Sequence, residues 1–368
     1  MTNATAAPER RRFPAPTPND TLVSPVVEGR SITFRLYAPE AHTVALRGDL
    51  VEGEPRGGFQ RDQQGIWTLT LQDVTPGTYR YQYVVDQAIV PDPRNPMISP
   101  THTTVMNLVR VTAPETLSED TTDVPHGSIA SVWYPSPVFG GHRRMQVYTP
   151  PKTLRTSGEL PVLYLLHGGG DCDASWSTVG RAGFILDNLI ATGSAVPMLI
   201  VMPSGHAPGL RTGPAGSPAM TANPANDPFT ADLLQGVMPW VEANLGAAAC
   251  PERRALAGLS MGGVQAGNIG IVHSHLFRYL GIFSSGWFPE VRAEFESTQG
   301  EAMRAAAERY HLVWVAWGST DIARPNSLAM LEMFDRHGIR YTARETGGGH
   351  TWANWRDYLR DMAPLLFR

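Results

Sequence analysis

The segment GLSMG at positions 258–262 contains the serine best placed for nucleophilic chemistry. It matches the pattern G-x-S-x-G, in which a serine lies on a sharp turn between a strand and a helix. The residues just before Ser260 form a strand-like apolar run, and residues 263–272 can continue as a helix. This setting favours Ser260 as a nucleophile. The alternative is a glycine-rich turn whose serine has no catalytic role.

A serine nucleophile needs a neighbouring base, because a hydroxyl is a weak nucleophile at neutral pH. Among the 11 histidines, His350 lies in the glycine-rich segment TGGGHTW. This segment follows the strand-like run 340–344 and precedes an amphipathic helical pattern. Serine hydrolases of this kind place their triad in the chain order serine, carboxylate, histidine. We therefore predict that His350 is the catalytic base.

The third member should be a carboxylate at the end of a strand between the serine and the histidine. Residues 312–317 form an apolar, strand-like run, and Asp321 follows it directly after GST. Asp321 is therefore predicted to orient the imidazole of His350 and to stabilise its charged form. The alternative is that Asp321 only caps a following helix, a position where aspartate is favoured. Asp335 and Glu345 are less suitably placed.

Ester hydrolysis through a tetrahedral intermediate also needs two N–H donors for the oxyanion. One is the amide of Met261, which directly follows the serine. The other is expected in the glycine-rich turn HGGG at 167–170, after an early apolar run, and Gly169 is the predicted donor. Such a loop could instead hold a phosphate. However, no Lys-Ser or Lys-Thr follows it, and no G-x-G-x-x-G precedes a helix.

Tryptophans on or near these loops are candidates for an aromatic-lined pocket. Trp176, Trp287, Trp352 and Trp355 all lie on or near them. The first three are the candidates for substrate contact, and packing in the core is the alternative role for each. The chain has only two cysteines, Cys172 and Cys250, which allow one disulfide at most and no cysteine-built zinc site. No other metal-ligand pattern occurs in the sequence, so we expect neither a metal nor a cofactor.

Changes in composition and in hydrophobic pattern divide the sequence into four parts. Residues 1–20 are rich in Pro, Ala and Arg and are predicted to be a mobile tail. Residues 21–112 contain short alternating strands separated by turn residues, which predict a small antiparallel β-sandwich. Residues 113–127 are polar and acidic and are predicted to be a linker. Residues 128–368 alternate buried apolar runs with helical patterns, which indicates a parallel sheet covered on both faces.

Composition narrows the class of protein. The chain has 368 residues, of which 42% are hydrophobic, so packed cores are expected. Its net charge of −4 argues against a nucleic-acid partner. No apolar run reaches the ~18 residues needed to cross a bilayer, so no membrane partner is expected. The N-terminus has no apolar core of a signal peptide, which suggests a cytoplasmic protein as the sequence stands. A trimmed signal peptide would leave the same sequence for a secreted or periplasmic protein.

The larger part resembles the feruloyl and acetyl-xylan esterases of carbohydrate esterase family 1, within the esterase D and enterochelin-esterase-like group. The similar segments are HGSIASVWYPSP, RRMQVYTPP, VLYLLHGGGDCDASW, VGRAGFILDNLI, MLIVMPSGH, AGLSMGG and GGGHTWANWRDYLRDMAPLLF. The resemblance implies an α/β-hydrolase fold in which Ser260, Asp321 and His350 are nucleophile, acid and base. It also implies the two oxyanion donors already named.

The N-terminal segments GIWTLTLQDVTPGTYRYQYVVD and VPDPRNP resemble a carbohydrate-binding module of family 48, which implies an immunoglobulin-like sandwich. Together the resemblances imply a serine esterase acting on feruloyl or acetyl esters of plant polysaccharide. All five predicted catalytic groups lie after residue 160, so the sandwich is expected to serve substrate access and not chemistry. A catalytic part beginning near Asp123 is therefore expected to hydrolyse small esters alone. The alternatives are an esterase for a siderophore or another small ester, and a glycan-binding protein without catalysis.

Overall fold

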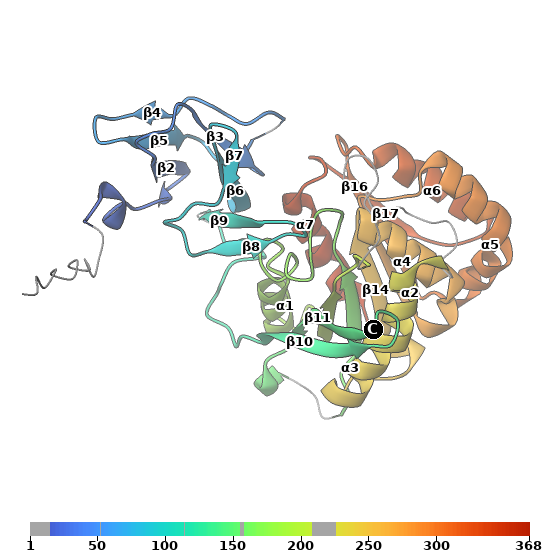
Figure 1. The fold of residues 1–368 in the computed structure, drawn as a ribbon. Coiled ribbons are helices and arrows are strands. Elements are labelled where there is room, and N and C mark those ends of the chain that lie inside the picture. Colours follow the sequence, from blue (N-terminus) through green and yellow to red (C-terminus); the bar gives the residue numbers. More distant parts are fainter. Residues whose placement is uncertain (1–14, 52, 114, 155–157, 208–225) are drawn as a thin grey trace, which may run out of the picture.

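The chain forms a smaller all-β part and a larger α/β part that lie side by side (Figure 1). Of the predicted mobile tail, residues 1–14 lie outside the described residues, and Pro18–Asp20 form a short 3-10 helix, η1. The computed structural model describes residues 15–51, 53–113, 115–154, 158–207 and 226–368.

The smaller part is a sandwich of two antiparallel sheets, as predicted. The first sheet has the order β1-β2-β5-β4 and the second has the order β3-β6-β9-β8, with β7 paired to β6. Alternate side chains of β2, including Ile32 and Phe34, point into one core shared with Tyr81 and Tyr83 of β6. The strands are β1 (Val26–Glu28), β2 (Ser31–Tyr37), β3 (Val44–Gly48), β4 (Gln60–Arg61), β5 (Ile66–Leu71), β6 (Gly77–Val85), β7 (Ala88–Val90), β8 (Ile98–Pro100) and β9 (Val105–Val111).

The larger part is built on one eight-stranded sheet of order β10-β11-β13-β12-β14-β15-β16-β17. The six strands from β13 to β17 in this order pair in parallel, and several are buried along their whole length, as the apolar runs predicted. Strands β10 and β11 form an antiparallel hairpin on one edge. The strands are β10 (Ser128–Ser136), β11 (Gly141–Thr149), β12 (Val162–Leu166), β13 (Leu199–Pro203), β14 (Arg254–Leu259), β15 (Tyr279–Phe283), β16 (Leu312–Gly318) and β17 (Thr342–Thr346).

Helices cover both faces of this sheet, so it has two separate cores. One core contains α1 and α7, and the other contains α2 to α6. The α-helices are α1 (Ala182–Ala191), α2 (Pro228–Asp232), α3 (Met238–Leu245), α4 (Met261–Val272), α5 (Pro289–Arg309), α6 (Arg324–Arg336) and α7 (Trp352–Met362). A π-helical turn and short 3-10 turns complete the structure: η2 (Lys152–Leu154), η4 (Leu233–Val237), η5 (Pro251–Arg253), η6 (Ser274–Leu276) and η7 (Ala363–Leu365).

The segment between the two parts is held against α1 and α7. Arg181 Nε donates to the carbonyl oxygen of Glu119 over 2.7 Å, and the Glu119 carboxylate lies 3.0 Å from Nε of Arg356 on α7. Asn188 of α1 donates to two further carbonyl oxygens of the segment at 2.9 Å. Its polar residues therefore make specific bonds, and the segment is a fixed connection rather than a free tether.

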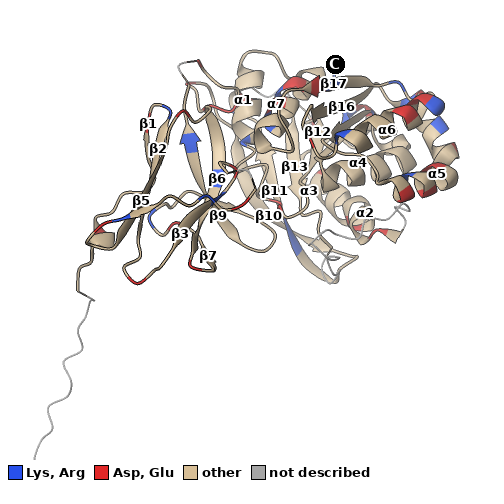
Figure 2. Cartoon of the chain, turned by 90° about the horizontal axis from the view of Figure 1, so that it is seen from above, with Lys and Arg blue, Asp and Glu red and all other residues tan. Residues whose placement is uncertain are grey.

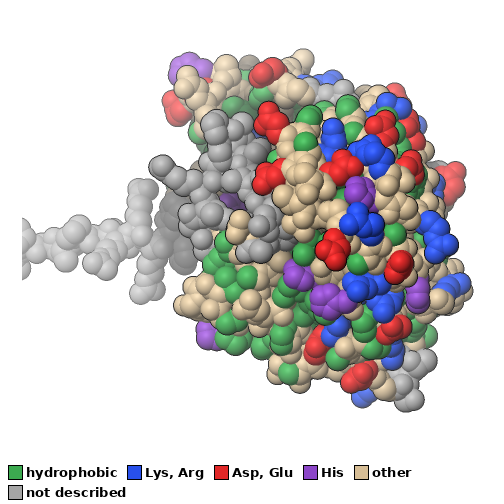
Figure 3. Space-filling view, turned by 90° about the vertical axis from the view of Figure 1, so that its right-hand side faces the viewer, with side chains coloured by type: hydrophobic (Ala, Val, Ile, Leu, Met, Phe, Trp, Pro, Cys, Tyr) green, Lys and Arg blue, Asp and Glu red, His purple; other side chains and the backbone are tan. Residues whose placement is uncertain are grey.

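Charged residues gather on α5 and α6, at the end of the molecule away from the sandwich (Figure 2). Seen from that side, acidic and basic groups are interspersed rather than separated (Figure 3). The pair Arg336–Glu296, with 2.8 Å between Nη2 and Oε2, joins the two helices. Within the described part of the chain, no helix combines the length and apolar character that a membrane span requires.

Candidate active site

Ser260 lies at the turn between β14 and α4, in the strained conformation that a nucleophile elbow requires. Its φ is +52° and its ψ is −117°, which is rare for a residue with a side chain. The two flanking glycines permit the turn. A Cβ on Gly258 would lie 2.2 Å from the carbonyl oxygen of Gly262, and one on Gly262 would lie 2.4 Å from that of His167. Any larger residue would push the turn open.

The three predicted triad residues come together at one edge of the sheet, after the carboxyl ends of β14, β16 and β17. The Ser260 hydroxyl donates to Nε2 of His350 over 3.0 Å, and His350 Nδ1–H donates to Oδ1 of Asp321 over 2.8 Å. The Asp321 side chain is fully buried, whereas the His350 side chain is 23% exposed and faces the cavity. This is the arrangement in which a histidine can take the serine proton while a carboxylate fixes its tautomer.

The surroundings of Asp321 keep its carboxylate charged. Burial alone raises the pKa of Asp321, but the side chains of His350 and Ser284 and the N–H of Ala323 outweigh it, so the pKa is lowered. The Ala323 N–H donates to Oδ1 over 2.7 Å, just before α6 begins. Asp321 therefore both orients the histidine and holds the backbone leading into α6, and the two sequence interpretations are compatible.

Two serines that the sequence analysis did not name, and Trp355, to which it gave no specific contact, support the triad. Trp355 packs edge-on against His350 with 5.0 Å between ring centroids, and its Nε1–H donates to the Ser284 hydroxyl over 2.9 Å. The Ser285 hydroxyl donates to the backbone carbonyl oxygen of Ser260 over 2.6 Å. The signal for both serines was their place directly after β15, the strand beside the nucleophile strand.

The glycine loop, residues 167–171, lies against the nucleophile. A Cβ on Gly168 would come within 3.3 Å of Ser260 Cβ, and nothing lies within 4 Å of the corresponding point on Gly169 among the described residues. Gly169 therefore faces the same cavity as the serine hydroxyl. Met261 is the first residue of α4, where backbone N–H groups have no partner within the helix.

His167 fixes the beginning of the glycine loop as a neutral side chain. Its Nδ1–H donates to the carbonyl oxygen of Gly168 over 2.8 Å, and its Nε2 accepts from the N–H of Gly205 over 2.9 Å. Complete burial lowers the pKa of His167 to about 4. At neutral pH the ring therefore carries no charge and serves as a rigid bridge between the ends of β12 and β13.

A cavity of about 470 Å³ opens above the triad, and both parts of the chain line it. The α/β part contributes the triad serine and histidine, the glycine loop and Trp355. The sandwich contributes a predominantly polar wall, which was not foreseen when the sandwich was expected to serve access alone. The sandwich residues are Arg47, Arg80, Gln82, Ile89, Thr101, Thr103, Thr104 and Met106.

The three tryptophans predicted to contact substrate are buried instead. Trp176, Trp287 and Trp352 are 1%, 1% and 2% exposed, and none is among the described residues that line the cavity. Trp176 donates to the last carbonyl oxygen of β12, Trp287 donates to a buried asparagine, and Trp352 packs edge-on against Trp176 with 5.1 Å between centroids. Packing, the alternative role, explains them, and Trp355 takes the place beside the cavity.

The cysteines form no disulfide, and the Cys172 thiol is buried and hydrogen-bonded. Both Cys172 and Cys250 are free. Burial raises the pKa of the Cys172 thiol, and the thiol donates to the carbonyl oxygen of Pro100 over 3.3 Å. Within the described ranges, no group of three His, Cys, Asp or Glu side chains could hold a metal ion.

Comparison with known proteins places both parts in families. Residues 136–366 match the family described as "Putative esterase". Residues 22–100 match carbohydrate-binding module 48, described as the isoamylase N-terminal domain.

Curated relatives share the esterase name but are longer. An endo-1,4-beta-xylanase/feruloyl esterase of Xylanibacter ruminicola is 30% identical over 351 residues, which cover 91% of this chain and 44% of that protein. An esterase of Mycobacterium tuberculosis is 38% identical over 117 residues, covering 32% of this chain and 23% of that protein. The chain therefore spans less than half the length of these relatives.

Solved structures share the fold. The enterobactin esterase FES from Shigella flexneri aligns over 92% of this chain and 93% of its own, with a TM-score of 0.62 and 18% identity. A ferulic acid esterase from Anaeromyces mucronatus aligns over 69% of this chain and 96% of its own, with a TM-score of 0.58 and 23% identity. The predicted α/β-hydrolase fold is thus confirmed. Because the esterase match spans residues 136–366 and so most of the chain, this protein belongs to the esterase family.

Proposed function

We propose that this protein is a serine carboxylic ester hydrolase that works through an acyl-enzyme. The observation that carries this proposal is the continuous hydrogen-bonded line from Ser260 through His350 to Asp321. Ser260, the nucleophile, lies on a strained turn at the start of α4 and lines the cavity. A hydroxyl in this setting, with a base whose tautomer is fixed, is activated for attack on a carbonyl carbon.

The geometry supports a two-stage reaction. Ser260 Oγ attacks the ester carbonyl while His350 Nε2 takes its proton, and the N–H groups of Gly169 and Met261 stabilise the oxyanion. The tetrahedral intermediate collapses, and His350 gives the proton to the leaving alcohol. Water then repeats the sequence on the acyl-enzyme, with His350 again as base, and releases the acid. Asp321 stays charged throughout and stabilises the imidazolium.

The substrate we propose is a feruloyl or acetyl ester on plant polysaccharide. The cavity volume is in the range of small-molecule sites. Leu259, Trp355 and Met106 give it apolar surface for an aromatic acyl group. Arg47 and Gln82 give polar surface for the hydroxyls of a sugar alcohol. The relative named as a xylanase/feruloyl esterase and the match to carbohydrate-binding module 48 support the same substrate class.

A siderophore or another small ester is the second candidate. The fold similarity to the enterobactin esterase favours it, because that similarity extends over both parts of the chain. A glycan-binding protein without catalysis is the third candidate, and the assembled triad counts against it.

A substrate panel tests the proposal. We expect methyl ferulate to be hydrolysed with the highest kcat/KM, ahead of acetylated xylan, nitrophenyl acetate and a catechol trilactone. A pocket that accommodates the aromatic acyl group should favour the feruloyl ester by about 10-fold or more over an ester with a smaller acyl group. The measurement is initial rates for all four esters, with Ser260→Ala as the blank. Highest kcat/KM on the trilactone would favour the siderophore candidate, and no turnover of any ester would contradict the esterase proposal.

A further inference from the structure

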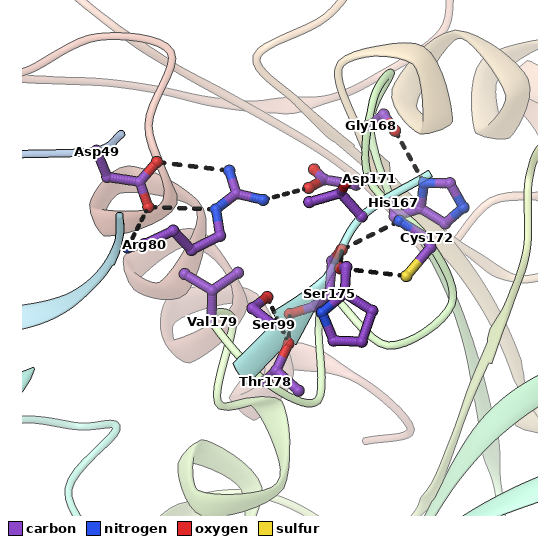
Figure 4. Close-up of polar contacts among 12 residues, drawn as sticks. Asp49, Arg80, Ser99, His167, Gly168, Asp171, Cys172, Ser175, Thr178 and Val179 are labelled. Carbon is purple, nitrogen blue, oxygen red and sulfur yellow. Dashed lines mark hydrogen bonds and ion pairs between the residues drawn. The ribbon is translucent and has the colours of Figure 1, made fainter. Parts of the chain in front are cut away.

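We propose that the β-sandwich positions the oxyanion donor, and that Arg80 is the positioning residue. This rests on the proposed esterase function, because it assigns a task to the Gly169 N–H. The glycine loop is held from the sandwich side by Arg80 on β6 and by the turn between β8 and β9 (Figure 4). An oxyanion hole works only when its donors are fixed before the charge develops.

Arg80 is held between one carboxylate on the sandwich and one on the glycine loop. Its Nη1 donates to Asp171 Oδ1 over 2.6 Å, and its Nε donates to Asp49 Oδ2 over 3.3 Å. The backbone N–H of Arg80 also donates to Asp49, over 2.9 Å. The side chains of Arg80 and Asp171 are only 13% and 7% exposed. Figure 4 shows the guanidinium lying between the two carboxylates.

The turn between β8 and β9 fixes the same loop through the backbone. The N–H of His102 donates to the carbonyl oxygen of Gly170 over 2.9 Å. One residue beyond the loop, the Cys172 thiol donates to Pro100 at the end of β8. Gly170 has a φ of +80°, and the N–H of Asp171 reaches back to Gly168 over 3.3 Å. The sandwich therefore holds Gly170 and Asp171, and the Asp171 N–H in turn bonds to the carbonyl oxygen of Gly168, which belongs to the peptide unit that carries the Gly169 N–H.

Arg80 also lies against the loop of the proposed base. Its guanidinium carbon is 5.7 Å from the ring centroid of Trp352, which follows His350 by two residues. A single sandwich side chain thus contacts the segments that carry the donor and the base. A displacement of about 1 Å in such groups can cost about 100-fold in rate.

The contacts of Arg80 differ from those of Arg47, its neighbour in the cavity wall. All three guanidinium nitrogens of Arg80 face Asp49 or Asp171. Arg47 lines the same cavity, and its side chain makes no hydrogen bond or ion pair with the described residues. Burial raises the pKa of Asp171, and Arg80 opposes this shift. Losing Arg80 would leave Asp171 buried without its cation, so the loop would have to rearrange.

The test is a double-mutant cycle on the full chain with methyl ferulate and nitrophenyl acetate. We expect Arg80→Gln to lower kcat by about 10- to 100-fold, part of the 10²- to 10³-fold loss seen when an oxyanion donor is removed. KM should stay within about threefold. Asp171→Asn should lower kcat in the same direction, and the double variant should lose no more than Arg80→Gln, because both changes break one contact.

A second readout separates positioning from general disruption. The affinity for an aryl trifluoromethyl ketone, which forms an oxyanion when Ser260 adds to it, should fall by the same factor as kcat/KM. Binding of the product acid, which forms no such oxyanion, should change by less than about threefold. Matched control variants are Ser99→Ala, which removes a sandwich bond of 2.8 Å to Thr178 away from the loop, and Arg47→Gln. We expect Ser99→Ala to keep the wild-type kcat. Any effect of Arg47→Gln should appear in KM and not in kcat.

Several results would overturn the inference. These are a kcat within twofold of wild type in both Arg80→Gln and Asp171→Asn, a loss confined to KM, or losses that multiply in the double variant. If Arg80→Gln fails to fold, Asp171→Asn decides alone, since asparagine keeps the shape of the side chain. Wild-type protein without Ser260-dependent turnover would instead contradict the proposed function, so the two failures are distinguishable.

Discussion

Ser260→Ala is expected to lower kcat for ester hydrolysis by up to about 10⁶-fold while the protein still folds. The hydroxyl is the atom that attacks, and its hydrogen bond within the site is to His350 Nε2. Removing one hydroxyl from a turn already formed around φ = +52° should cost little stability. The measurement is kcat on methyl ferulate beside the thermal unfolding midpoint.

Ser285→Ala is the matched control for this result. It removes a neighbouring hydroxyl that only supports the turn, through the bond to the Ser260 carbonyl oxygen. Its kcat should fall by about 10-fold or less, because one neutral hydrogen bond is worth about 1 kcal/mol. Turnover near the wild-type rate in folded Ser260→Ala would show that another group performs the chemistry.

Asp321→Asn should give the second largest loss, up to about 10⁴-fold in kcat. The lowered pKa of Asp321 means that the wild-type side chain carries a negative charge beside the imidazole. Asparagine removes that charge, and its amide N–H can donate to His350 Nδ1. The imidazole proton then lies on Nε2, so Nε2 can no longer accept the hydrogen bond and the proton of Ser260. Oδ1 also accepts from the Ala323 N–H, so an amide nitrogen that takes its place beside the histidine loses this bond as well, at a cost of about 1 kcal/mol in stability.

The measurement is kcat at constant folded fraction, checked by the unfolding midpoint. Glu345→Gln serves as the matched control, since Glu345 is a nearby carboxylate that pairs with Arg324 over 3.2 Å rather than with the histidine. It should retain kcat within about twofold. An active Asp321→Asn variant together with an impaired Glu345→Gln variant would show that Glu345, and not Asp321, is the catalytic acid.

The site could be predicted where local chemistry and chain order determine it. The turn at Ser260 needs glycines on both sides because backbone approaches within 2.4 Å of where their Cβ atoms would be. Apolar runs such as β12 and β14 are buried on both faces, so they are recognisable without alternation. The chain order then left few positions for the base and the acid, and in the structure His350 reaches Ser260 and Asp321 reaches His350.

Several of the features missed depend on how the sandwich docks. On β6, the core-facing Tyr81 and Tyr83 alternate with Arg80 and Gln82, a pattern that reads as one buried face and one solvated face. The structure places that polar face against the glycine loop and the cavity. The sequence pattern distinguishes a polar face of a strand from an apolar one. It does not show whether the polar face is covered by water or by a second domain. The same limit applies to the polar segment 113–127 that was predicted to be a linker, whose contacts with α1 and α7 its composition does not reveal.

The tryptophans failed for a different reason. Their positions on loops beside the predicted active site could not show whether the indole N–H meets substrate or a buried oxygen. Trp176 and Trp287 both donate within the core, and such satisfied indoles are as readily accommodated inside as at a pocket wall. Trp355 lies about one helical turn after Trp352 on α7, and this position places Trp355 in the wall of the cavity.

The most direct measurement is covalent labelling of the wild-type protein with a fluorophosphonate, followed by peptide mass mapping. The probe mimics the tetrahedral intermediate and stays on the nucleophile. We predict one label per chain, located on the peptide that carries Ser260, and loss of esterase activity in proportion to labelling. Asp321→Asn should label far more slowly. A stoichiometric label on any other residue, or full activity in fully labelled protein, would contradict the assignment of Ser260 as the residue that forms the acyl-enzyme.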